Sequence, residues 1–481
     1  MELKKLLKNV KVKKLVGDAK IEIENLACES NAVTNGCLFF CIEGTRIDGH
    51  KYAYQAEKNG AVAIVCQKEL EVNATQIIVD DVREAMSSIA GEFFGRADKQ
   101  LKIIGVTGTN GKTTTTNLIY QMLNSLDKPT ALIGTLGTFF KDRFIEPTLT
   151  TPDPIELHRQ LKEMHLLGVQ YVVMEVSAHA LFFDKIKGLD FSIVVFTNFT
   201  QDHLDFFSNM DEYKNAKLKL FTDYKFKYAV TNSDDIVGRE VGNKINGCIS
   251  YGIENPADVF AIRIKESSDK TEFVVNLFDY VDNVKIPLIG RFNAYNAMCA
   301  LTVCSLLGVS AEDAVNAINK VSAVSGRLEL IYNKEFSVFI DYAHTPDGLE
   351  KSLTALKNTC LGRLICVFGC GGNRDKSKRY EMGRISGKIA DFTIITSDNP
   401  RYEDPMEIIR EIEKGVLSES RKYVLIENRE SAIEYALNYI KPKDVVLIAG
   451  KGCENYQEVL GIKKAYNDKD AVEEILRSNR L

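Results

Sequence analysis

The stretch GVTGTNGKTTTT, residues 105–116, combines glycines, a lysine and threonines in an order that suits the binding of phosphate groups. Glycines let backbone N–H groups approach phosphate oxygens, the start of a helix favours anions, and the lysine adds a positive charge. The strict phosphate-loop pattern needs glycine at position 106, where this chain has Val106, but glycines at 105, 108 and 111 fit the pattern GxxGxxGKT. We call residues 105–116 the phosphate loop.

The phosphate loop is flanked by a strand pattern and a helix pattern. The apolar run LKIIGV leads into it, and NLIYQML follows with helical spacing. In that setting Lys112 would reach the β- and γ-phosphates of a nucleotide, and Thr113 would hold magnesium. The alternative is a glycine-rich turn that binds nothing.

A second stretch, TSDNPRYEDP at residues 396–405, places an arginine directly after a proline. It follows the apolar run DFTIIT, so the chain leaves a strand and turns. Asp398 and Asn399 favour turns, and Pro400 fixes φ and cannot continue a strand ladder. The guanidinium of Arg401 could then form a two-pronged contact with a carboxylate. A solvated surface turn is the alternative.

Three blocks of alternating strands and helices are expected to position these residues in an α/β fold. Residues 1–98 form a small α/β unit, residues 99–330 a central, mostly parallel sheet, and residues 331–481 a Rossmann-like parallel sheet. The predicted strands include CLFFCI, AVAIVCQ, QIIVDD, YVVMEVS, FSIVVFTN, KYAVTN, SVFIDYA, RLICVFGCGG, FTIITSDN, KYVLIEN and DVVLIAGKG. Ligands bind at the carboxyl ends of such strands, where Arg401 would lie.

The composition argues against binding of nucleic acid or insertion into a membrane. Of 481 residues 45% are hydrophobic and 26% charged, and the net charge is −5. No apolar run approaches the ~20 residues of a membrane span, and the charged start lacks the apolar segment of a secretory signal. Eleven cysteines without a CxxC pair indicate a reducing, cytoplasmic setting. Cys37, Cys41, Cys366 and Cys370 are expected in the core.

The phosphate loop resembles the ATP loop of the Mur ligases and of folylpolyglutamate synthase. Further motifs, in sequence order, extend the resemblance to the Mur ligase family over essentially the whole chain. They are MEVSAHAL (174–181), TNFTQDHLDFF (197–207), YKNAKLKLF (213–221), GRFNAYNAMCAL (290–301), SGRLEL (325–330), DYAHTPDGLEKSL (341–353), FGCGGNRDKSKR (368–379), DNPR (398–401) and AGKGCENYQ (449–457). Within the family they are similar to the ligases that add the third amino acid of the peptidoglycan stem peptide.

This resemblance implies a ligation that uses ATP and Mg²⁺. ATP would phosphorylate the D-glutamate carboxylate of UDP-MurNAc-L-Ala-D-Glu, and an amine would then attack the acyl phosphate to form an amide. Because the intermediate concentrates negative charge, cations must surround it. The implied partners are these small-molecule substrates, with no nucleic acid and no membrane insertion, and the protein is expected to be a monomer.

The resemblance assigns catalysis to Lys112, Glu175, His203 and Lys217. Thr113, Glu175 and His203 would bind Mg²⁺. Lys217 would bind it as an N-carbamoylated side chain, since carboxylate-type oxygens suit magnesium as an ammonium cannot. Without the resemblance, the alternatives are a buried, paired glutamate, a packed histidine and a solvated lysine.

The resemblance also implies a set of ATP contacts from the central and third blocks. Asn293 and Asn296 would lie near the adenine, Arg327 near the phosphates, and Asp341 near the nucleotide. His344 falls close by with a less defined role. The full set is Gly108, Thr109, Asn110, Gly111, Lys112, Thr113, Thr114, Asn293, Asn296, Arg327 and Asp341.

Contacts with UDP-MurNAc-dipeptide are implied in the first two blocks. The implied residues are Ser30, Thr150, Thr151, Ser177 and Lys185. Thr45, Arg46 and Ile47 of the loop GTRIDG are weaker candidates. The alternative for the hydroxyl groups is an ordinary role in turns and helix caps.

The incoming amino acid would be bound by the third block. The implied residues are Arg374, Asp398, Asn399, Pro400, Arg401, Gly450 and Glu454. The form DNPR occurs in relatives that use meso-diaminopimelate, and lysine-adding relatives have a different residue in place of the arginine. Arg401 would bind the extra carboxylate and repel the terminal ammonium of lysine, and Glu454 would bind the distal ammonium.

The chain departs from the family pattern at four positions. Phe183 replaces a glutamine and Lys185 an arginine, both of which normally touch the sugar nucleotide. Phe207 replaces a common histidine, and Cys453 replaces the usual histidine. Three alternatives therefore stay open: a lysine-adding or relaxed-specificity ligase, a folylpolyglutamate synthase-like enzyme, and a non-catalytic protein that binds UDP-MurNAc peptides.

Overall fold

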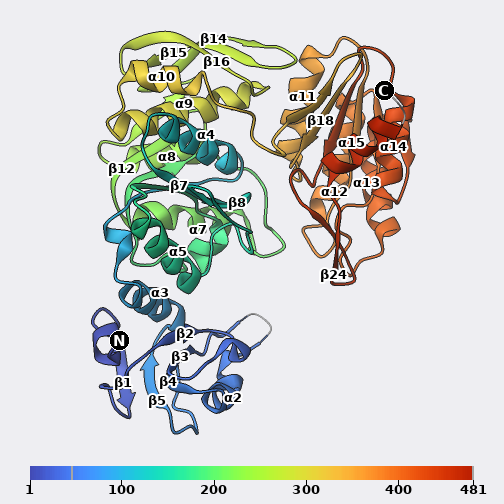
Figure 1. Cartoon of the computed structure of the whole chain (residues 1–481). Coiled ribbons are helices and arrows are strands. Elements are labelled where there is room, and N and C mark those ends of the chain that lie inside the picture. Colours follow the sequence, from blue (N-terminus) through green and yellow to red (C-terminus); the bar gives the residue numbers. More distant parts are fainter. Residues whose placement is uncertain (45–46, 479–481) are drawn as a thin grey trace. The chain divides into compact units, whose positions relative to one another are not determined.

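The computed structural model describes residues 1–44 and 47–478, and the chain divides into two compact units (Figure 1). The first unit comprises Met1–Thr107, Lys128–Val194 and Ala216–Tyr228, and the second comprises Gly108–Asp127, Val195–Asn215 and Ala229–Leu481. The candidate residues Thr45 and Arg46 lie outside the described residues. The three predicted domains, with boundaries near residues 98 and 330, stay a prediction.

The first unit begins with a five-stranded sheet in the order β1-β5-β4-β3-β2. Its strands are β1 (Val12–Val16), β2 (Asn25–Ala27), β3 (Cys37–Phe40), β4 (Ala61–Cys66) and β5 (Thr75–Val79), and its helices are α1 (Leu3–Leu6), α2 (Ala53–Lys58) and α3 (Val82–Phe93). All pairs are parallel except β1 with β5. Every residue of CLFF in β3 is buried, because both faces of the sheet carry apolar clusters.

The rest of the first unit contains strands in the order β12-β11-β6-β10-β7-β8-β9. They are β6 (Lys102–Thr107), β7 (Thr130–Gly134), β8 (Gly137–Phe140), β9 (Arg143–Ile145), β10 (Tyr171–Glu175), β11 (Asp190–Phe196) and β12 (Lys225–Asn232), with helices α5 (Pro154–Leu166), α6 (Ala178–Phe182) and α7 (Met210–Thr222). Strand β10 pairs in parallel with β6 and β7, so the candidate ligand Glu175 comes at the carboxyl end of a buried strand.

The second unit contains residues 229–232 of β12 and a run of strands in the order β12-β13-β14-β15-β16. The added strands are β13 (Ile249–Gly252), β14 (Val259–Glu266), β15 (Thr271–Leu277) and β16 (Tyr280–Ile286), and the helices are α4 (Lys112–Ser125), α8 (Ile236–Lys244), α9 (Arg291–Leu306) and α10 (Ala311–Ile318). Strands β14, β15 and β16 form an antiparallel meander. Helix α4 follows the phosphate loop, as predicted.

The second unit also holds a six-stranded sheet in the order β17-β18-β22-β19-β20-β21, which is parallel except for the edge strand β17. Its strands are β17 (Glu329–Asn333), β18 (Ser337–Asp341), β19 (Leu364–Phe368), β20 (Phe392–Ile395), β21 (Tyr423–Leu425) and β22 (Val445–Ala449). Its helices are α11 (Pro346–Thr359), α12 (Ser377–Ile389), α13 (Pro405–Glu419), α14 (Arg429–Tyr439) and α15 (Asp468–Ser478), and a hairpin joins β23 (Tyr456–Val459) to β24 (Ile462–Ala465).

This sheet is doubly wound. One apolar cluster joins α11, α12 and α13 to one face, and another joins α14 and α15 to the other. The alternation of apolar runs and helical patterns produces this arrangement, because strands covered on both faces must be apolar throughout. The predicted α/β class and the mostly parallel central sheet are confirmed. The four cysteines expected in the core are buried. No helix in the described part of the chain is long and apolar enough to cross a membrane.

Candidate functional site

The phosphate loop is held by the segment that follows β11. The backbone N–H of Thr109 donates to Asn198 O at 2.8 Å, and the hydroxyl of Thr197 donates to Asn110 O at 2.7 Å. The side chain of Asn198 accepts from Asn110 N at 2.9 Å. These three bonds engage the backbone N–H of Thr109 and the backbone N–H and C=O of Asn110, and they fix the path of the loop before α4.

Two glycines are required where the loop passes its neighbours. Gly108 has φ +138°, and a Cβ there would lie 1.9 Å from the hydroxyl of Thr197. Gly111 has φ +84°, and a Cβ there would lie 2.6 Å from Asn296 Oδ1. Only glycine combines these conformations with such close approach, so the glycine pattern of the sequence has a direct structural cause.

Lys112, Thr113 and Arg327 lie at the start of α4. The Lys112 ammonium donates to the carbonyls of Gly108 and Thr109 at 2.9 and 2.7 Å. Arg327 Nη2 donates to the Thr113 hydroxyl at 2.7 Å, and its guanidinium stacks on the ring of Tyr342 at 4.6 Å. Arg327 Nε is buried and has no hydrogen-bond partner within the described residues. A donor left in this state beside a phosphate loop suits an anionic phosphate.

Asp341, Asn293 and Asn296 are buried close to these groups. The Asp341 carboxylate accepts from Leu328 N at 3.0 Å and from the Ser352 hydroxyl. Burial raises the pKa of Asp341 above its usual value, against the lowering effect of its hydrogen bond from Ser352. Both oxygens are therefore engaged in fixing the chain beside Arg327, which is a supporting position rather than an open contact.

The two asparagines form a short chain of side-chain bonds to α4. Asn296 Nδ2 donates to Asn293 Oδ1 at 2.9 Å, and the Thr115 hydroxyl donates to Asn296 Oδ1 at 3.3 Å. Helix α9 is thus tied to the helix that follows the phosphate loop. Thr114, the remaining candidate of this group, is buried in the first turn of α4.

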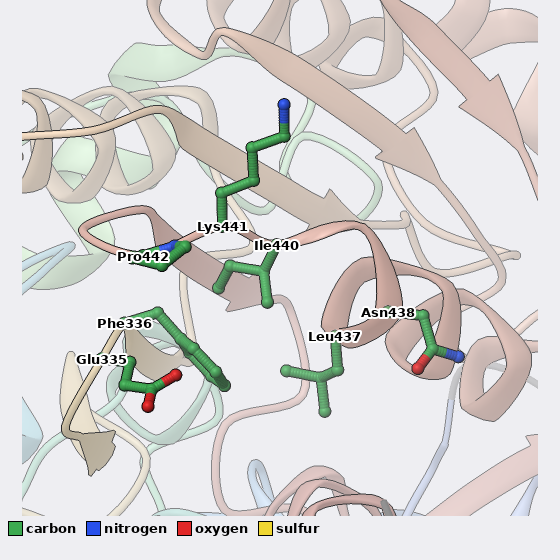
Figure 2. A pocket seen from close by; sticks show the side chains of 7 residues that line it. All are labelled: Glu335, Phe336, Leu437, Asn438, Ile440, Lys441 and Pro442. Atoms are coloured by element: carbon green, nitrogen blue, oxygen red, sulfur yellow. The ribbon is translucent and has the colours of Figure 1, made fainter. Parts of the chain in front are cut away.

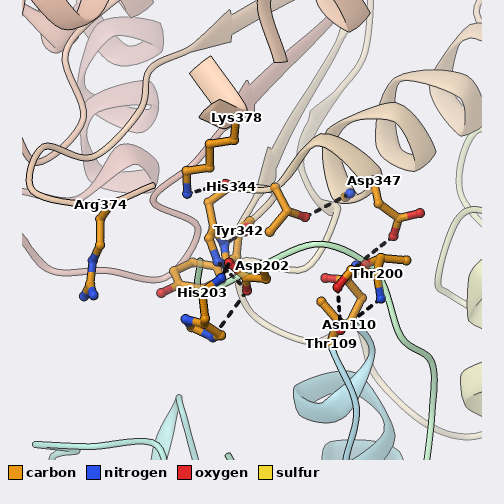
Figure 3. A network of polar contacts seen from close by, with 12 residues as sticks. Thr109, Asn110, Thr200, Asp202, His203, Tyr342, His344, Asp347, Arg374 and Lys378 are labelled. Atoms are coloured by element: carbon orange, nitrogen blue, oxygen red, sulfur yellow. Dashed lines mark hydrogen bonds and ion pairs between the residues drawn. The ribbon is translucent and has the colours of Figure 1, made fainter. Parts of the chain in front are cut away.

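A polar network links the phosphate loop to the loops that follow β11 and β18 (Figure 3). Asn110 Nδ2 donates to Asp347 Oδ2 at 2.7 Å, and Asp202 Oδ2 lies 3.3 Å from His203 Nε2 and 3.9 Å from His344 Nε2. Burial would raise the pKa of Asp202, but the neighbouring imidazoles and Lys378 outweigh it and lower that pKa. His203 has φ +56°, and its ring lies 5.8 Å from that of Tyr213.

In the first unit, Glu175 accepts from Thr135 twice. Its Oε1 accepts from the Thr135 N–H at 2.8 Å and its Oε2 from the Thr135 hydroxyl at 3.2 Å. The hydroxyl of Thr150 lies 3.2 Å from that of Thr135, and Thr151 donates to Glu175 O at 2.8 Å. The candidates Thr150 and Thr151 are therefore brought to the end of β10 beside Glu175.

Ser177 and Lys185 lie in the same unit. The hydroxyl of Ser177 caps α6 by accepting from Ala180 N, and it lies 3.4 Å from the hydroxyl of Thr151. The Lys185 ammonium pairs with Asp153 at 2.7 Å. The capping role expected as an alternative for Ser177 is thus present.

The first unit also holds Ser30 and Phe183. Asn59 Nδ2 donates to the carbonyl of Ser30 at 2.7 Å. The guanidinium of Arg83 stacks on the ring of Phe183 at 4.6 Å, so the aromatic side chain that replaces a glutamine supports a cation. Phe207, another departure, is buried and packs on Tyr213 at 5.2 Å.

The implied magnesium ligands are divided between the units. Glu175 and Lys217 belong to the first unit, and Thr113 and His203 to the second. Lys217 is 1% exposed, so the alternative of a solvated lysine is wrong. Within the described residues no three His, Cys, Asp or Glu side chains form a cluster that could hold a metal. The implied set contains only two side chains of these types, so that finding does not exclude it.

The third block brings several predicted residues together at the carboxyl edge of its sheet, in what we call the amino-acid corner, residues 398–401 and 450–458. Arg401 has φ +52°, its N–H donates to Glu458 O at 3.1 Å, and its carbonyl accepts from Leu460 N at 2.7 Å. Its Nε pairs with Glu458 Oε2 at 3.2 Å, and its Nη1 donates to Gly372 O at 2.8 Å. The hairpin β23–β24 therefore fixes Arg401, together with the preceding Pro400.

Asn399 connects this arginine to Glu454. Its Nδ2 donates to Glu454 Oε2 at 2.9 Å, and its Oδ1 accepts from Glu458 N at 2.9 Å and from Lys451 Nζ at 3.0 Å. Asp398 lies beside Gly450, where a Cβ would come within 2.7 Å of Asp398 Oδ2.

Arg374 lies nearby and is more exposed. It pairs with Asp205 at 3.2 Å, and a Cβ on Gly371 would lie 3.7 Å from Arg374 Cγ and 2.9 Å from Arg401 Nη1. The seven candidates for the amino acid thus share one edge of the sheet, as the sequence predicts.

Lys451 and Glu458 of this region were not anticipated, and neither was Asp347 beside the phosphate loop. Lys451 is fully buried and pairs with Glu454 at 2.9 Å. Lys451 comes two residues after the fully buried strand β22 and three residues before Glu454, but nothing in the sequence shows that it is buried.

A hollow at the other end of the same sheet carries none of these features (Figure 2). Phe336, Leu437 and Pro442 are among its lining residues, and they precede β18 and β22 or end α14. It lies at the amino ends of the parallel strands, whereas ligands of such sheets bind at the carboxyl ends.

Comparison with known proteins gives a consistent family. Residues 106–304 match the Mur ligase middle domain, residues 326–452 the Mur ligase glutamate ligase domain, and residues 22–94 the Mur ligase family catalytic domain.

Relatives match over nearly the full length. The chain is 43% identical over 484 residues to UDP-N-acetylmuramoyl-L-alanyl-D-glutamate–2,6-diaminopimelate ligase 1 of Clostridium acetobutylicum, and 99% of each chain is covered. It is 41% identical to the ligase of the same description in Syntrophomonas wolfei, again with 99% of each covered. A solved structure of such a ligase matches with a TM-score of 0.71 at 30% identity, covering 100% of this chain and 99% of the other.

Proposed function

This chain belongs to the Mur ligase family, and from that premise we propose that it joins meso-2,6-diaminopimelate to UDP-MurNAc-L-Ala-D-Glu in peptidoglycan precursor synthesis. The enzyme is an ATP-dependent amide ligase. The D-glutamate carboxylate is activated as an acyl phosphate, and an amine of the incoming amino acid displaces the phosphate to form the amide bond. Diaminopimelate ligases that match 99% of the chain support this substrate.

The observation that carries the amino-acid assignment is that Arg401 pairs with Glu458, and that Asn399 connects Glu458 to Glu454. A guanidinium has five N–H groups, and among the described residues two of those on Arg401 are used, by Glu458 and Gly372. The unused ones suit a carboxylate. Asn399 and Lys451 both donate to Glu454 Oε2, so Oε1 is the oxygen that we assign to an ammonium. One carboxylate and one ammonium on a single carbon are what the distal end of diaminopimelate offers and lysine does not.

The phosphate-binding residues divide their work. Lys112 lies at the start of α4 and binds the β- and γ-phosphates, while the unsatisfied Nε of Arg327 approaches the same anion. The start of α4 at Lys112–Thr114 favours negative charge. Asn293 and Asn296 bind on the adenine side, and Asp341 holds the chain that carries Arg327.

We propose that magnesium neutralises phosphate charge in this reaction. The Thr113 hydroxyl, the Glu175 carboxylate, His203 and carbamoylated Lys217 are the groups that would hold it. Lys217 is buried, so its side chain is not exposed to solvent as an ordinary surface lysine is. Mass spectrometry of the intact native protein tests the carbamate, with Lys217→Ala as the control that removes it.

Sugar-nucleotide recognition is assigned to the first unit. Ser30, Thr150, Thr151, Ser177 and Lys185 form the proposed set. Lys185 keeps the positive charge of the family's arginine but lacks the two-pronged guanidinium. An ion pair with Asp153 holds the Lys185 side chain in place. We also propose that the protein acts as a cytoplasmic monomer, which light scattering on the eluting protein tests.

The experiment that tests the function is phosphate release in the presence of UDP-MurNAc-L-Ala-D-Glu, ATP, Mg²⁺ and one amino acid at a time. Turnover is expected with meso-diaminopimelate and at least tenfold less with L-lysine. Equal turnover with lysine would favour the relaxed-specificity alternative. Turnover only with a folate and glutamate would favour the folylpolyglutamate synthase-like alternative, and none with any acceptor would favour a binding protein.

A further inference from the structure

Lys451 is a charged side chain that the proposed reaction does not use directly. It follows Gly450 after β22 and is 0% exposed. Its ammonium has three N–H groups. Two of them donate, to Asn399 Oδ1 at 3.0 Å and to Glu454 Oε2 at 2.9 Å, and the ammonium lies 5.5 Å from the centre of the Tyr456 ring. A buried ammonium is costly unless its donors are satisfied in this way.

The position of Lys451 settles which way the Asn399 amide faces. Asn399 Oδ1 accepts from Lys451 Nζ and from the Glu458 N–H, so the NH₂ group must face the other way. On that side it donates to Glu454 Oε2 at 2.9 Å. Because Lys451 and the Glu458 N–H are donors and Glu454 Oε2 is an acceptor, only one orientation of the Asn399 amide satisfies all three groups.

Glu454 is thereby fixed at one oxygen and open at the other. Its Oε2 accepts from both Lys451 and Asn399, and the side chain is 20% exposed. Both of these hydrogen bonds go to Oε2 and neither goes to Oε1. A carboxylate held by one oxygen in a charged hydrogen-bond pair has lost most of its rotational freedom, so its second oxygen points in a defined direction.

We propose that Lys451 is a positioning residue for the amine end of the incoming amino acid. It acts through Glu454 and Asn399, holding Glu454 Oε2 inward so that Oε1 accepts the distal ammonium beside Arg401. Because Lys451 is fully buried, it does not touch the amino acid itself. This inference rests on the proposed function, since it assigns Glu454 to the ammonium of diaminopimelate.

The test is Lys451→Met, which keeps the length and apolar stem of the side chain and removes its three donors. The KM for diaminopimelate is expected to rise about 10- to 100-fold, as for loss of a charged hydrogen bond. The KM values for ATP and for UDP-MurNAc-L-Ala-D-Glu, and kcat at saturating amino acid, are expected to stay within about threefold, because the contacts of Lys451 lie within the amino-acid corner.

Lys463→Met is the matched control. Lys463 also lies over the Tyr456 ring, at 4.1 Å, but it belongs to the exposed strand β24 and contacts neither Asn399 nor Glu454. It should leave every KM within about twofold. A rise in the KM for diaminopimelate in this control equal to that in Lys451→Met would overturn the proposal, since loss of any cation from the ring would then suffice.

A double-mutant cycle with Glu454→Gln separates positioning from a general structural role. If Lys451 acts through Glu454, adding Lys451→Met to Glu454→Gln should raise the KM for diaminopimelate by less than about threefold. Independent, multiplying effects would contradict the proposal, and so would parallel increases in the KM for ATP. Lys451→Gln, which keeps a donor, should give an intermediate KM and guards against a folding failure of the methionine variant.

The outcome for the wild type keeps the two proposals apart. Absence of wild-type turnover with diaminopimelate would remove the proposed substrate. Normal wild-type turnover together with an unchanged KM in Lys451→Met would remove only the role of Lys451.

Discussion

The phosphate loop and the amino-acid corner are built in different ways. The phosphate loop is held mainly through its own main-chain groups, as in the bond from Thr109 N to Asn198 O, and glycines with positive φ allow its course. The amino-acid corner adds ion pairs between side chains, Arg401–Glu458 and Lys451–Glu454, to the main-chain bonds of Arg401.

This difference bears on what each region can recognise. Backbone N–H groups do not change with the side chains, so a loop made from them binds the phosphates common to the whole family. A region made from paired side chains takes its selectivity from the identity of one or two of them. Changes in the phosphate loop should therefore affect every acceptor equally, and changes in the amino-acid corner should affect one acceptor.

The largest effect is expected for Gly108→Ala. The added Cβ would lie 1.9 Å from the Thr197 hydroxyl at φ +138°, so the loop must shift away from its phosphate-binding course. Turnover should fall on the order of 10³-fold with every amino acid, measured as phosphate release. Gly308→Ala is the control, because φ is +88° there and nothing lies within 4 Å of the added carbon. It should cost about 1 kcal/mol of stability and leave turnover intact.

A smaller and more selective effect is expected for Arg401→Ala. Loss of the carboxylate partner should lower kcat/KM for diaminopimelate about 10- to 100-fold and leave the KM for ATP unchanged. Arg410→Ala, at an exposed arginine of α13, should change neither. An equal loss for ATP and for all amino acids would show that Arg401 supports the fold and not the choice of substrate, and would break the contrast between the two regions.

The smallest effect is a pH dependence at the turn that carries Arg401. Glu403 pairs with the buried Arg379 at 3.0 Å, and mainly this hydrogen bond lowers the pKa of Glu403 to about 2. A carboxyl with a lowered folded pKa stabilises the fold above its usual pKa of 4.5, and that contribution is lost as the pH falls toward 2.

Urea unfolding followed by circular dichroism measures this contribution. Between pH 4.5 and 2 the wild-type midpoint should fall more steeply than that of Glu403→Gln. Glu407→Gln, at an exposed position in the first turn of α13, should keep the wild-type slope. Identical slopes of the unfolding midpoint against pH for all three proteins would mean that Glu403 does not stabilise this turn.

Much of the fold could be predicted from the sequence because the strands of a buried parallel sheet consist of consecutive apolar residues. CLFF, YVVME and VVLIA became β3, β10 and β22 with every residue buried. The meander β14–β16 was not predicted. Its strands alternate buried and exposed residues, and pairing with neighbouring strands, rather than an apolar run, defines them.

The candidate site likewise contains residues that could be predicted from the sequence and residues that could not. Glycines and the lysine of the phosphate loop could be predicted because their roles follow from local backbone geometry. Lys451 and Glu458 could not, because a lysine in a glycine-rich loop and a glutamate on a hairpin usually face solvent. Only the fold brings them to Asn399 and Arg401. The burial of Lys217 likewise depends on tertiary packing that no local pattern encodes.

Arg401 adopts a left-handed backbone conformation, with φ +52°. Asparagine or glycine takes up that conformation more readily than arginine. A lineage that exchanged this arginine for asparagine would relax the backbone while giving up a carboxylate partner, so stability would not oppose a change of cell-wall chemistry at this position. Persistence of arginine here would then record selection by the substrate, acting against the local preference of the chain.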